Sequence, residues 1–534
     1  MLSLIHVIEW RARVTPDHVA LSDHLGEQLT YAELAAAVES AAAGFAAAGL
    51  RPGQVIPVLA RNQASWVTAM FGLVRLGALP AAVNWRLAAG EVTALIELMR
   101  AGAPVPAVLA DADCEPLVKL ALALLPGGEP MLLGLTAAPP GRAAGPAPAG
   151  PAPALPVPPR PADRLRGPAP CLLLHTSGTT GRPKLVPQTH EMLISAVTFM
   201  KLEVPEAVPG TRHLSALPLF HVAGQANLAY SLFTGGHLHL LGGFDPAGFV
   251  DELAVRRIQL TQLVPALIGA VTREVLSRAE PPDLSALTEI VYGASPIHPD
   301  LLELAVRTLG CRFRQNYASS ETGPLPISSL SPADHDPARG KLATAGRPSL
   351  GWEVRTGEYG EIQVRGATVL PGYWNDDASS AAAMTADGFY RTGDAGLIDA
   401  DGYLTIVDRL KDMIITGGEN VYPAEVETVL ARYPGVAEVA VIGVPDGRWG
   451  ETVHAVVVPA PPAAGPGPGG PGDAPGGSGL DQGAMLTWAR ERLAGFKCPA
   501  GITVAAELPR NATGKVLKSV LREPYWAGRD RQVS

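Results

Sequence analysis

The stretch Cys171-Leu-Leu-Leu-His-Thr-Ser-Gly-Thr-Thr-Gly-Arg-Pro-Lys184 indicates both the fold class and the chemistry of this chain. Its first four residues form a short apolar run, which is typical of a buried strand. A loop rich in glycine and hydroxyl groups follows, and residues 189–200 then have the pattern of a helix. A strand, a glycine-rich loop and a helix in this order predict an α/β fold.

The loop itself predicts a phosphate-binding site. Backbone N–H groups, hydroxyl donors and one lysine cation can together surround a polyphosphate. The spacing is not that of a Walker A motif, because Pro183 stands five residues after Gly178, where that motif requires glycine. A P-loop kinase is therefore disfavoured, and the candidate phosphate ligands are Thr176, Ser177, Gly178, Thr179, Thr180, Gly181 and Lys184.

Length and composition limit the class of protein. A chain of 534 residues exceeds one ordinary hydrophobic core, and 47% apolar with 17% charged residues suits a globular protein with two or more domains. The net charge of −9, without a dense Lys/Arg stripe, gives no basis for nucleic-acid binding. The four cysteines have no CxxC spacing, which argues against zinc and disulfides and favours a reducing cytoplasm.

No secretory signal or membrane span is expected. Residues 1–10 have no basic leader and include Glu9. Residues 213–244 contain no Asp, Glu, Lys or Arg, but Pro218, Gln225 and paired glycines interrupt them. We therefore expect buried strands and helices there.

Two segments of biased composition are predicted to be weakly ordered surface loops. Residues 136–161 hold ten Pro and eight Ala, and residues 459–480 hold eight Gly and seven Pro. Further along, Asp401-Gly402 lies between two apolar runs and predicts a hairpin, and Pro423 opens a helical pattern.

Several further motifs follow the phosphate loop, and together they resemble the adenylate-forming superfamily of acyl-CoA synthetases, peptide-synthetase adenylation domains and beetle luciferases. The match covers the chain apart from the two Pro-rich segments. The motifs are Asn84-Trp-Arg-Leu87, Leu217-Pro-Leu-Phe-His-Val-Ala-Gly224, Asn316-Tyr-Ala-Ser-Ser-Glu-Thr-Gly323, Tyr390-Arg-Thr-Gly-Asp394, Asp408-Arg-Leu-Lys-Asp-Met-Ile-Ile-Thr-Gly-Gly-Glu-Asn-Val-Tyr-Pro423 and Asn511-Ala-Thr-Gly-Lys-Val-Leu-Lys518.

The resemblance implies a large N-terminal domain, residues 1–410, with two α/β sheets and a small β-rich subdomain. A smaller α+β C-terminal domain, residues 411–534, would be joined to it by a hinge at Lys411. The resemblance also suggests a homodimer.

The resemblance further implies roles for residues of the large domain. Glu321 would bind the Mg²⁺ that bridges the phosphates, and Ser320 would donate to the α-phosphate, although the family more often has threonine there. Tyr317 would stack on adenine opposite the strand that contains Gly293, Ala294 and Ser295.

Other roles fall near the domain junction and beyond it. Asp394 would accept both ribose hydroxyls, and Arg409 would reach ribose or phosphate. Lys515 would stabilise the charge that develops between the carboxylate and the α-phosphate. In a second orientation of the small domain, a tunnel for the thiol would be lined by Gly417, Gly418 and Glu419. The alternative is that these residues form a simple turn.

The acid pocket would include His221, Val222 and Gly224. His221 stands where adenylation domains for amino acids have an aspartate, which favours an acyl or aryl acid; a core histidine is the alternative. Leu185, where many relatives have glycine, could narrow the phosphate loop.

The predicted function is ATP-dependent conversion of a carboxylic acid to acyl-AMP and then, with CoA, to acyl-CoA. The alternatives are loading of an acyl carrier protein, a relative specialised in one half-reaction, and a non-catalytic nucleotide-binding relative. The last is disfavoured because Lys515, Glu321 and Asp394 are all present.

Overall fold

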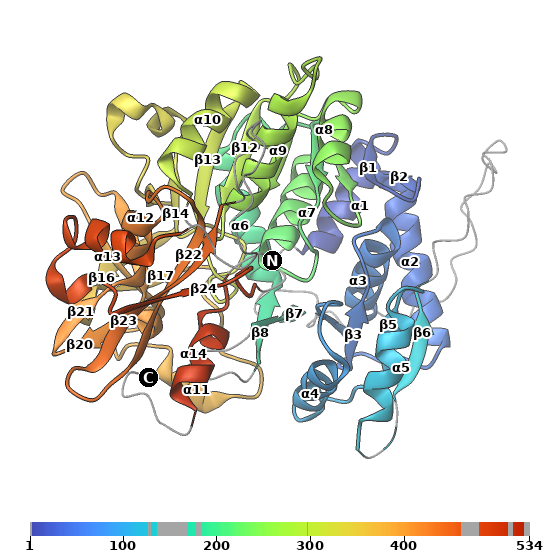
Figure 1. Cartoon of the computed structure of the whole chain (residues 1–534). Coiled ribbons are helices and arrows are strands. Elements are labelled where there is room, and N and C mark those ends of the chain that lie inside the picture. The colour runs from blue at the N-terminus through green and yellow to red at the C-terminus, as the bar shows by residue number, and fades with distance from the viewer. Residues whose placement is uncertain are drawn as a thin grey trace, which may run out of the picture. The chain divides into compact units, whose positions relative to one another are not determined.

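The structure is a computed structural model that describes residues 3–126, 128, 130–135, 169–176, 183–295, 297–460, 480–510 and 516–527. The chain forms two compact units, each described separately below (Figure 1). The first unit contains Met1–Val354 and Val364–Tyr390, and the second contains Arg355–Gln363 and Arg391–Ser534. The predicted loop 136–161, and loop 459–480 apart from residues 459, 460 and 480, lie outside the described residues.

A six-stranded sheet of the first unit has the order β6-β5-β3-β4-β7-β8. Its strands are parallel except β8, which returns antiparallel to β7. The predicted strand at Cys171 is confirmed as part of β7. The strands are β3 (Val55–Leu59), β4 (Leu79–Ala82), β5 (Ala107–Ala110), β6 (Met131–Gly134), β7 (Pro170–Thr176) and β8 (Lys184–Thr189).

A nine-stranded sheet in the same unit has the order β15-β14-β13-β12-β11-β9-β10-β1-β2. The six central strands are parallel, and β2, β14 and β15 are antiparallel to their neighbours. The strands are β1 (Val19–Asp23), β2 (Gln28–Thr30), β9 (Arg212–Ser215), β10 (His237–Leu240), β11 (Leu260–Leu263), β12 (Glu289–Gly293), β13 (Arg312–Tyr317), β14 (Ser328–Leu330) and β15 (Arg347–Pro348).

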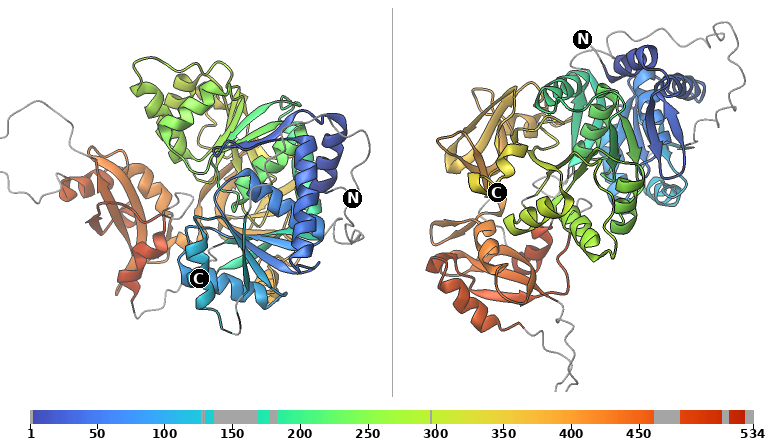
Figure 2. Two further views of the ribbon diagram at one scale, coloured as in Figure 1. Left: turned by 90° about the vertical axis from the view of Figure 1, so that its right-hand side faces the viewer. Right: turned by 90° about the horizontal axis from the view of Figure 1, so that it is seen from above.

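Helices cover both sheets (Figures 1 and 2). Helix α3 is buried along its whole length and contacts β1 of one sheet and β3 and β4 of the other, as expected for a helix that is apolar all round. Outer helices bury one apolar face each in the two large cores. The helices are α1 (Leu4–Val14), α2 (Tyr31–Ala47), α3 (Ala64–Leu76), α4 (Ala89–Arg100), α5 (Glu115–Ala123), α6 (His190–Glu203), α7 (Val222–Thr234), α8 (Pro246–Val255), α9 (Pro265–Ser277), α10 (Pro299–Leu309) and α11 (Asp377–Ala382), with 3-10 turns η1 (Pro332–His335) and η2 (Pro337–Arg339).

A four-stranded sheet has the order β16-β17-β18-β19. The hairpin predicted around Asp401-Gly402 is confirmed, because β18 and β19 pair antiparallel and Gly402 has a φ of +82°. Its elements are β16 (Trp352–Thr356), η3 (Glu358–Gly360), β17 (Glu361–Gly366), β18 (Tyr390–Ile398) and β19 (Leu404–Arg409).

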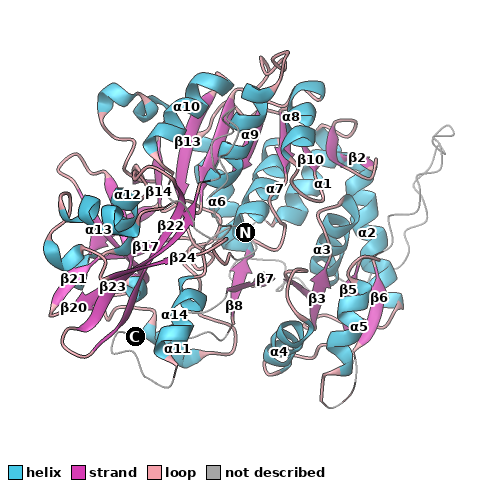
Figure 3. Ribbon diagram, in the orientation of Figure 1, coloured by secondary structure: helices cyan, strands magenta, loops and turns pink. Residues whose placement is uncertain are grey.

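A five-stranded sheet forms the core of the second unit, with the order β21-β20-β23-β22 and β24 paired to β23. Helices α12 and α13 pack on one face of this sheet and α14 packs on the other (Figure 3). Alternate residues of β22 enter the two cores, Val441 on one side and Ile442 on the other. The elements are η4 (Leu410–Asp412), β20 (Ile414–Thr416), β21 (Glu419–Val421), α12 (Pro423–Leu430), β22 (Val436–Asp446), β23 (Gly450–Pro459), α13 (Gln482–Arg490), η5 (Gly495–Lys497), β24 (Gly501–Val504) and α14 (Lys518–Trp526).

The predicted α/β class is therefore confirmed, with two mixed sheets, a small β-rich part and an α+β part. The charge-free residues 213–244 form β9, α7 and β10, as expected for buried elements. The domain boundary near residue 410 and the hinge at Lys411 stay predictions.

Candidate active site

The two ends of the phosphate loop lie side by side in the first unit. Thr176 ends β7, Lys184 begins β8, and the two residues are paired in the antiparallel register. Ser177, Gly178, Thr179, Thr180 and Gly181 lie outside the described residues.

The Leu185 side chain lies in the hydrophobic core, and its effect on the phosphate loop stays a prediction. Its side chain is 1% exposed and belongs to the core of the six-stranded sheet, with Trp374 packed against the same core. Its carbonyl accepts a hydrogen bond from the backbone N–H of Trp374, at 2.9 Å. The leucine that stands here, where many relatives have glycine, therefore adds a side chain to the hydrophobic core.

Lys184, Ser320 and Glu321 are connected through two further side chains. The Tyr373 hydroxyl donates to Glu321 Oε1 at 3.3 Å, and the Lys184 ammonium lies 4.5 Å from the centroid of the same tyrosine ring. Gln188 of β8 donates from Nε2 to the Ser320 carbonyl at 2.9 Å. The structure thus brings together a cation and a carboxylate from two separate motifs of the sequence.

The candidate adenine-binding residues lie at the ends of β12 and β13. Gly293 pairs with Asn316, and a Cβ at position 293 would lie 2.2 Å from the Asn316 carbonyl oxygen, so this position requires glycine. Ala294 follows with a φ of +71°, which is rare for a residue with a side chain. Tyr317 ends β13, and Ser295 lies two residues after the end of β12.

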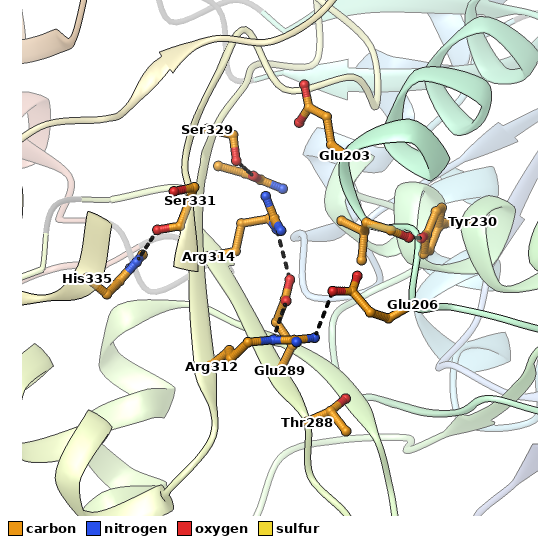
Figure 4. A network of polar contacts seen from close by, with 12 residues as sticks. Glu203, Glu206, Tyr230, Thr288, Glu289, Arg312, Arg314, Ser329, Ser331 and His335 are labelled. Carbon is orange, nitrogen blue, oxygen red and sulfur yellow. Dashed lines mark hydrogen bonds and ion pairs between the residues drawn. The ribbon is translucent and has the colours of Figure 1, made fainter. Parts of the chain in front are cut away.

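A buried ion-pair network fixes the opposite end of the same two strands (Figure 4). Glu289 is fully buried, with Oε1 2.8 Å from Arg314 Nε and Oε2 3.3 Å from Arg312 Nε. Arg312 also pairs with Glu206. A buried carboxylate needs such partners to offset its desolvation, and here they bind β12 to β13.

The candidate acid-pocket residues lie at the start of α7. His221 is the N-cap residue of this helix, and among the described residues its Nε2 has no hydrogen-bond partner. Burial, with His175 and Arg86 nearby, lowers the pKa of His221 to about 3, so the imidazole is neutral at physiological pH. Val222 begins the helix, and a Cβ on Gly224 would lie 2.2 Å from the Pro218 carbonyl oxygen.

Asp394 and Arg409 belong to the second unit and pair with each other. They are opposite residues in the β18–β19 register, and Arg409 Nε lies 2.9 Å from Asp394 Oδ1. Asp394 is buried, whereas the Arg409 side chain is 40% exposed. The two oxygens of an ionised carboxylate are the kind of acceptor that ribose hydroxyls require.

The segment proposed as a thiol tunnel is a tight hairpin between β20 and β21. Gly417 and Gly418 have φ values of +60° and +88°, and Glu419 begins β21. A Cβ on Gly417 would lie 2.7 Å from the Trp449 ring, and the Gly417 N–H donates to the Trp449 carbonyl at 2.9 Å. The turn requires both glycines, and the tunnel stays a prediction.

Lys411 lies in η4 of the second unit, where burial lowers its pKa. Lys515 lies outside the described residues, but the chain on either side of it is held. Arg510 and Val516 form an antiparallel bridge, and the Leu517 N–H donates to the Pro509 carbonyl at 2.7 Å.

Helix α14, which begins three residues after Lys515, makes two buried ion pairs. Lys518 Nζ lies 2.7 Å from Glu427 Oε1, and Arg522 lies 2.7 Å from Asp412 Oδ1. Lys518 ends the motif that begins at Asn511, but no role for it was predicted from the sequence.

Tyr373 and Gln188 were also not predicted from the sequence. Gln188 lies in β8, just beyond the phosphate loop, without a recognisable pattern. Tyr373 had a signal, because Pro371-Gly372 predicts a turn and two aromatic residues directly follow it.

Metal ligation in this chain would rest on few side chains. Among the described residues no group of three or more His, Cys, Asp or Glu could hold a metal ion. Mg²⁺ is commonly bound through one or two carboxylates together with substrate phosphates, and Glu321 beside Lys184 fits this arrangement. In the described part of the chain, no helix is long and apolar enough to cross a membrane.

Comparison with protein families decides the classification. The model for "AMP-binding enzyme" matches residues 8–374, and the model for the "AMP-binding enzyme C-terminal domain" matches residues 425–515. The chain belongs to the AMP-binding enzyme family.

Individual relatives support the same classification of this AMP-binding enzyme. A feruloyl-CoA synthase of an Amycolatopsis species is 36% identical, covering 96% of this chain and 97% of the relative. An indoleacetate–CoA ligase of Aromatoleum aromaticum is also 36% identical, covering 93% of each chain. The solved o-succinylbenzoate CoA synthetase of Bacillus subtilis, in complex with its acyl-adenylate, has a TM-score of 0.78 and 28% identity over 96% of this chain and 97% of that one.

The chain is thus an acid–thiol ligase, which activates a carboxylic acid as an acyl-adenylate and transfers the acyl group to CoA. The alternative of loading a carrier protein is not favoured, because these relatives are CoA synthetases and ligases.

Proposed function

We propose that this acid–thiol ligase uses Mg²⁺ and ATP to activate an aryl or arylalkanoic acid. The acids named for the three relatives above all contain an aromatic ring. The neutral His221 near the acid pocket offers no counter-ion for an ammonium group, which supports an acid without one. The contacts of Lys184 with the Tyr373 ring and of Glu321 with its hydroxyl are the observation that carries the proposal. They set a candidate phosphate-binding cation close to a candidate metal-binding carboxylate.

In the first half-reaction a carboxylate oxygen attacks the α-phosphorus, and the bond from that phosphorus to the bridging oxygen of pyrophosphate breaks. The phosphate loop and Lys184 bind the phosphates, Ser320 donates to the α-phosphate, and Tyr317 and residues 293–295 bind adenine. Glu321 would hold Mg²⁺, which when bound neutralises phosphate charge.

The second unit supplies the remaining groups. Asp394 accepts the ribose hydroxyls and Arg409 contacts ribose or phosphate. Lys515 stabilises negative charge that develops in the transition state, which is where a preorganised cation contributes most.

In the second half-reaction the CoA thiol loses its proton, its sulfur attacks the acyl carbon, and AMP leaves with the electrons of the broken acyl–oxygen bond. Gly417, Gly418 and Glu419 line the path of the thiol arm. Lys411 is the hinge between the two states, and Lys411→Pro should impair the thioester step while sparing adenylation; unchanged rates in a well-folded variant would remove the hinge assignment.

We place the enzyme in the cytoplasm. Its four cysteines, Cys114, Cys171, Cys311 and Cys498, are unpaired, which suits a reducing compartment. A homodimer remains a prediction, which sedimentation velocity would check.

A panel of acids tests the proposal. Pyrophosphate release and thioester formation are measured with cinnamic, benzoic, arylacetic, medium-chain and long-chain fatty acids, offering CoA and a phosphopantetheinyl carrier protein separately. We expect aromatic acids with CoA to give the highest kcat/KM. A preference for fatty acids would overturn the acid class, and transfer only to the carrier would overturn the thiol acceptor.

A further inference from the structure

The segment of residues 368–375, Thr368-Val-Leu-Pro-Gly-Tyr-Trp-Asn375, belongs to none of the motifs assigned above, yet it binds to two of them. The Thr368 hydroxyl donates to the Thr322 carbonyl at 2.7 Å, and the Leu370 N–H donates to the Glu321 carbonyl at 2.7 Å. The segment therefore fixes the backbone of the residue proposed to hold Mg²⁺.

The other end of the same segment is attached to the strand that follows the phosphate loop. The Trp374 N–H donates to the Leu185 carbonyl at 2.9 Å, and a Cβ on Gly102 would lie only 2.4 Å from Trp374 Nε1. Gly372 and Asn375, with φ values of +143° and +53°, delimit the turn. Such a conformation persists only where the surrounding contacts hold it.

Tyr373, at the centre of this turn, contacts two opposite charges at once. Its hydroxyl donates to Glu321 Oε1, and its ring face lies beneath the Lys184 ammonium. The hydroxyl is the donor in this contact, because an ionised carboxylate can only accept. Its backbone N–H is fixed separately, by Ser380 Oγ at 2.8 Å.

Lys184 and Glu321 form no ion pair with each other, although one contacts the ring of Tyr373 and the other contacts its hydroxyl. Without the ring, a direct pair would be favourable in a partly buried site, and it would neutralise both groups. A phenol satisfies each charge weakly, through one hydrogen bond and one cation–π contact.

We propose that Tyr373 is a positioning residue that separates Lys184 from Glu321, so that the cation remains available to the ATP phosphates and the carboxylate to Mg²⁺. The inference rests on the proposed roles of these two residues. It predicts that Tyr373 acts on binding of the metal–nucleotide before any chemistry takes place.

Two substitutions separate the contacts of the hydroxyl from the contact of the ring. Tyr373→Phe keeps the ring and removes the hydroxyl, and we expect Mg·ATP to bind about tenfold more weakly. Tyr373→Leu removes the ring as well, so Lys184 and Glu321 can pair, and we expect a loss of about 100-fold. Binding is measured by calorimetry with a non-hydrolysable ATP analogue, and Mn²⁺ bound in its presence is measured by electron paramagnetic resonance.

The decisive measurement is made without metal. In EDTA, nucleotide binding depends on Lys184 but not on Mg²⁺. Tyr373→Leu should therefore weaken nucleotide binding. The double variant with Tyr373→Leu and Glu321→Gln should bind nucleotide as the wild type does. A residue that only stabilises the fold would not be rescued by removing a charge. Tyr31→Phe, which removes the hydroxyl of another buried tyrosine bonded to the Gly236 carbonyl, is the matched control and should bind as the wild type does.

Two outcomes distinguish the inference from the function on which it rests. Variants of normal melting temperature that bind nucleotide as the wild type does, or a double variant without rescue, would overturn the role of Tyr373 alone. A wild-type enzyme that neither binds ATP nor releases pyrophosphate with any acid would overturn the proposed function instead.

Discussion

The two units hold their candidate site residues by different forces. In the first unit, Gln188 and Tyr373 hold Ser320, Glu321 and Lys184 through hydrogen bonds and a ring contact. In the second, ion pairs do this work: Asp394 with Arg409, Asp412 with Arg522, and Glu427 with Lys518.

This difference has a chemical consequence. Neutral partners leave the charges of Lys184 and Glu321 available to a charged ligand, whereas ion pairs use charge to fix structure, both at Glu289 of the first unit and in the second unit. A buried pair is costly to break, because the remaining charge has lost water and its partner. We therefore expect substitutions that break an ion pair near the second unit's site residues to reduce stability, and substitutions of the neutral partners in the first unit to reduce ligand binding. The following predictions test this comparison.

The largest effect is expected at Lys515. Lys515→Ala should slow acyl-adenylate formation about 10²- to 10³-fold, because it removes an electrostatic contact to the transition state. Thioester formation from synthetic acyl-AMP and CoA should be largely retained. Equal loss of both steps would contradict the assignment, and Lys497→Ala, at a lysine paired with Glu425 in the same unit, should leave adenylation unchanged.

Breaking one ion pair of α14 should destabilise the second unit. Glu427→Gln leaves Lys518 buried without its counter-ion, and we expect the free energy of unfolding to fall by about 3 kcal/mol. Amide hydrogen exchange of α12 and α14 measures this. Glu438→Gln, which breaks the more exposed pair with Arg510, is the matched control and should cost less than about 1 kcal/mol. Equal effects of the two substitutions would remove the distinction between the pairs.

The first unit should be the more sensitive to acid. Burial lowers the pKa of His213 to about 3 and of His237 and His239 to about 4, whereas their unfolded value is near 6.5. Below pH 6.5 the unfolded state therefore binds more protons than the folded state. The free energy of unfolding has its full value above about pH 6.5 and decreases towards pH 4, by at most about 1.4 kcal/mol per histidine and pH unit.

Thermal melts between pH 7.5 and 5 check this prediction. His239→Gln should flatten the dependence of Tm on pH more than His454→Gln, because the pKa of the second unit's His454 is lowered while that side chain is less buried. A larger effect of His454→Gln would reverse the comparison.

The smallest effect is expected from deleting residues 462–478. The described residues on both sides are anchored independently of this segment: the Ala460 N–H donates to the Gly435 carbonyl, and Asp481 caps α13. Loop shortening changes closure entropy only modestly. Activity and soluble yield should stay within about twofold of the wild type, and a collapse of yield would show that the segment is structural.

Much of the fold could be predicted from periodicity and turn residues. The strand at Cys171, the hairpin at Gly402 and the helix from Pro423 all follow from local patterns. That last helix ends at Leu430, and tight turns through Tyr433 follow it.

The site could be predicted only where one motif contains the signal. Phosphate-loop residues share a short stretch, and so do Ser320 and Glu321. The contact between Lys184 and Glu321 through Tyr373 joins residues far apart in the sequence, and no local pattern specifies it. The pairing of Asp394 with Arg409 depends in the same way on the register of two strands.

The central claim is that this chain activates an acid by adenylation and then forms a CoA thioester. Its most direct test is product analysis by phosphorus NMR and mass spectrometry, with an aromatic acid, ATP and Mg²⁺, first without CoA and then with it. Acid-dependent formation of enzyme-bound acyl-AMP and pyrophosphate is predicted, followed by conversion to acyl-CoA and AMP when CoA is added. Formation of ADP and phosphate, or of a thioester without AMP, would contradict the account.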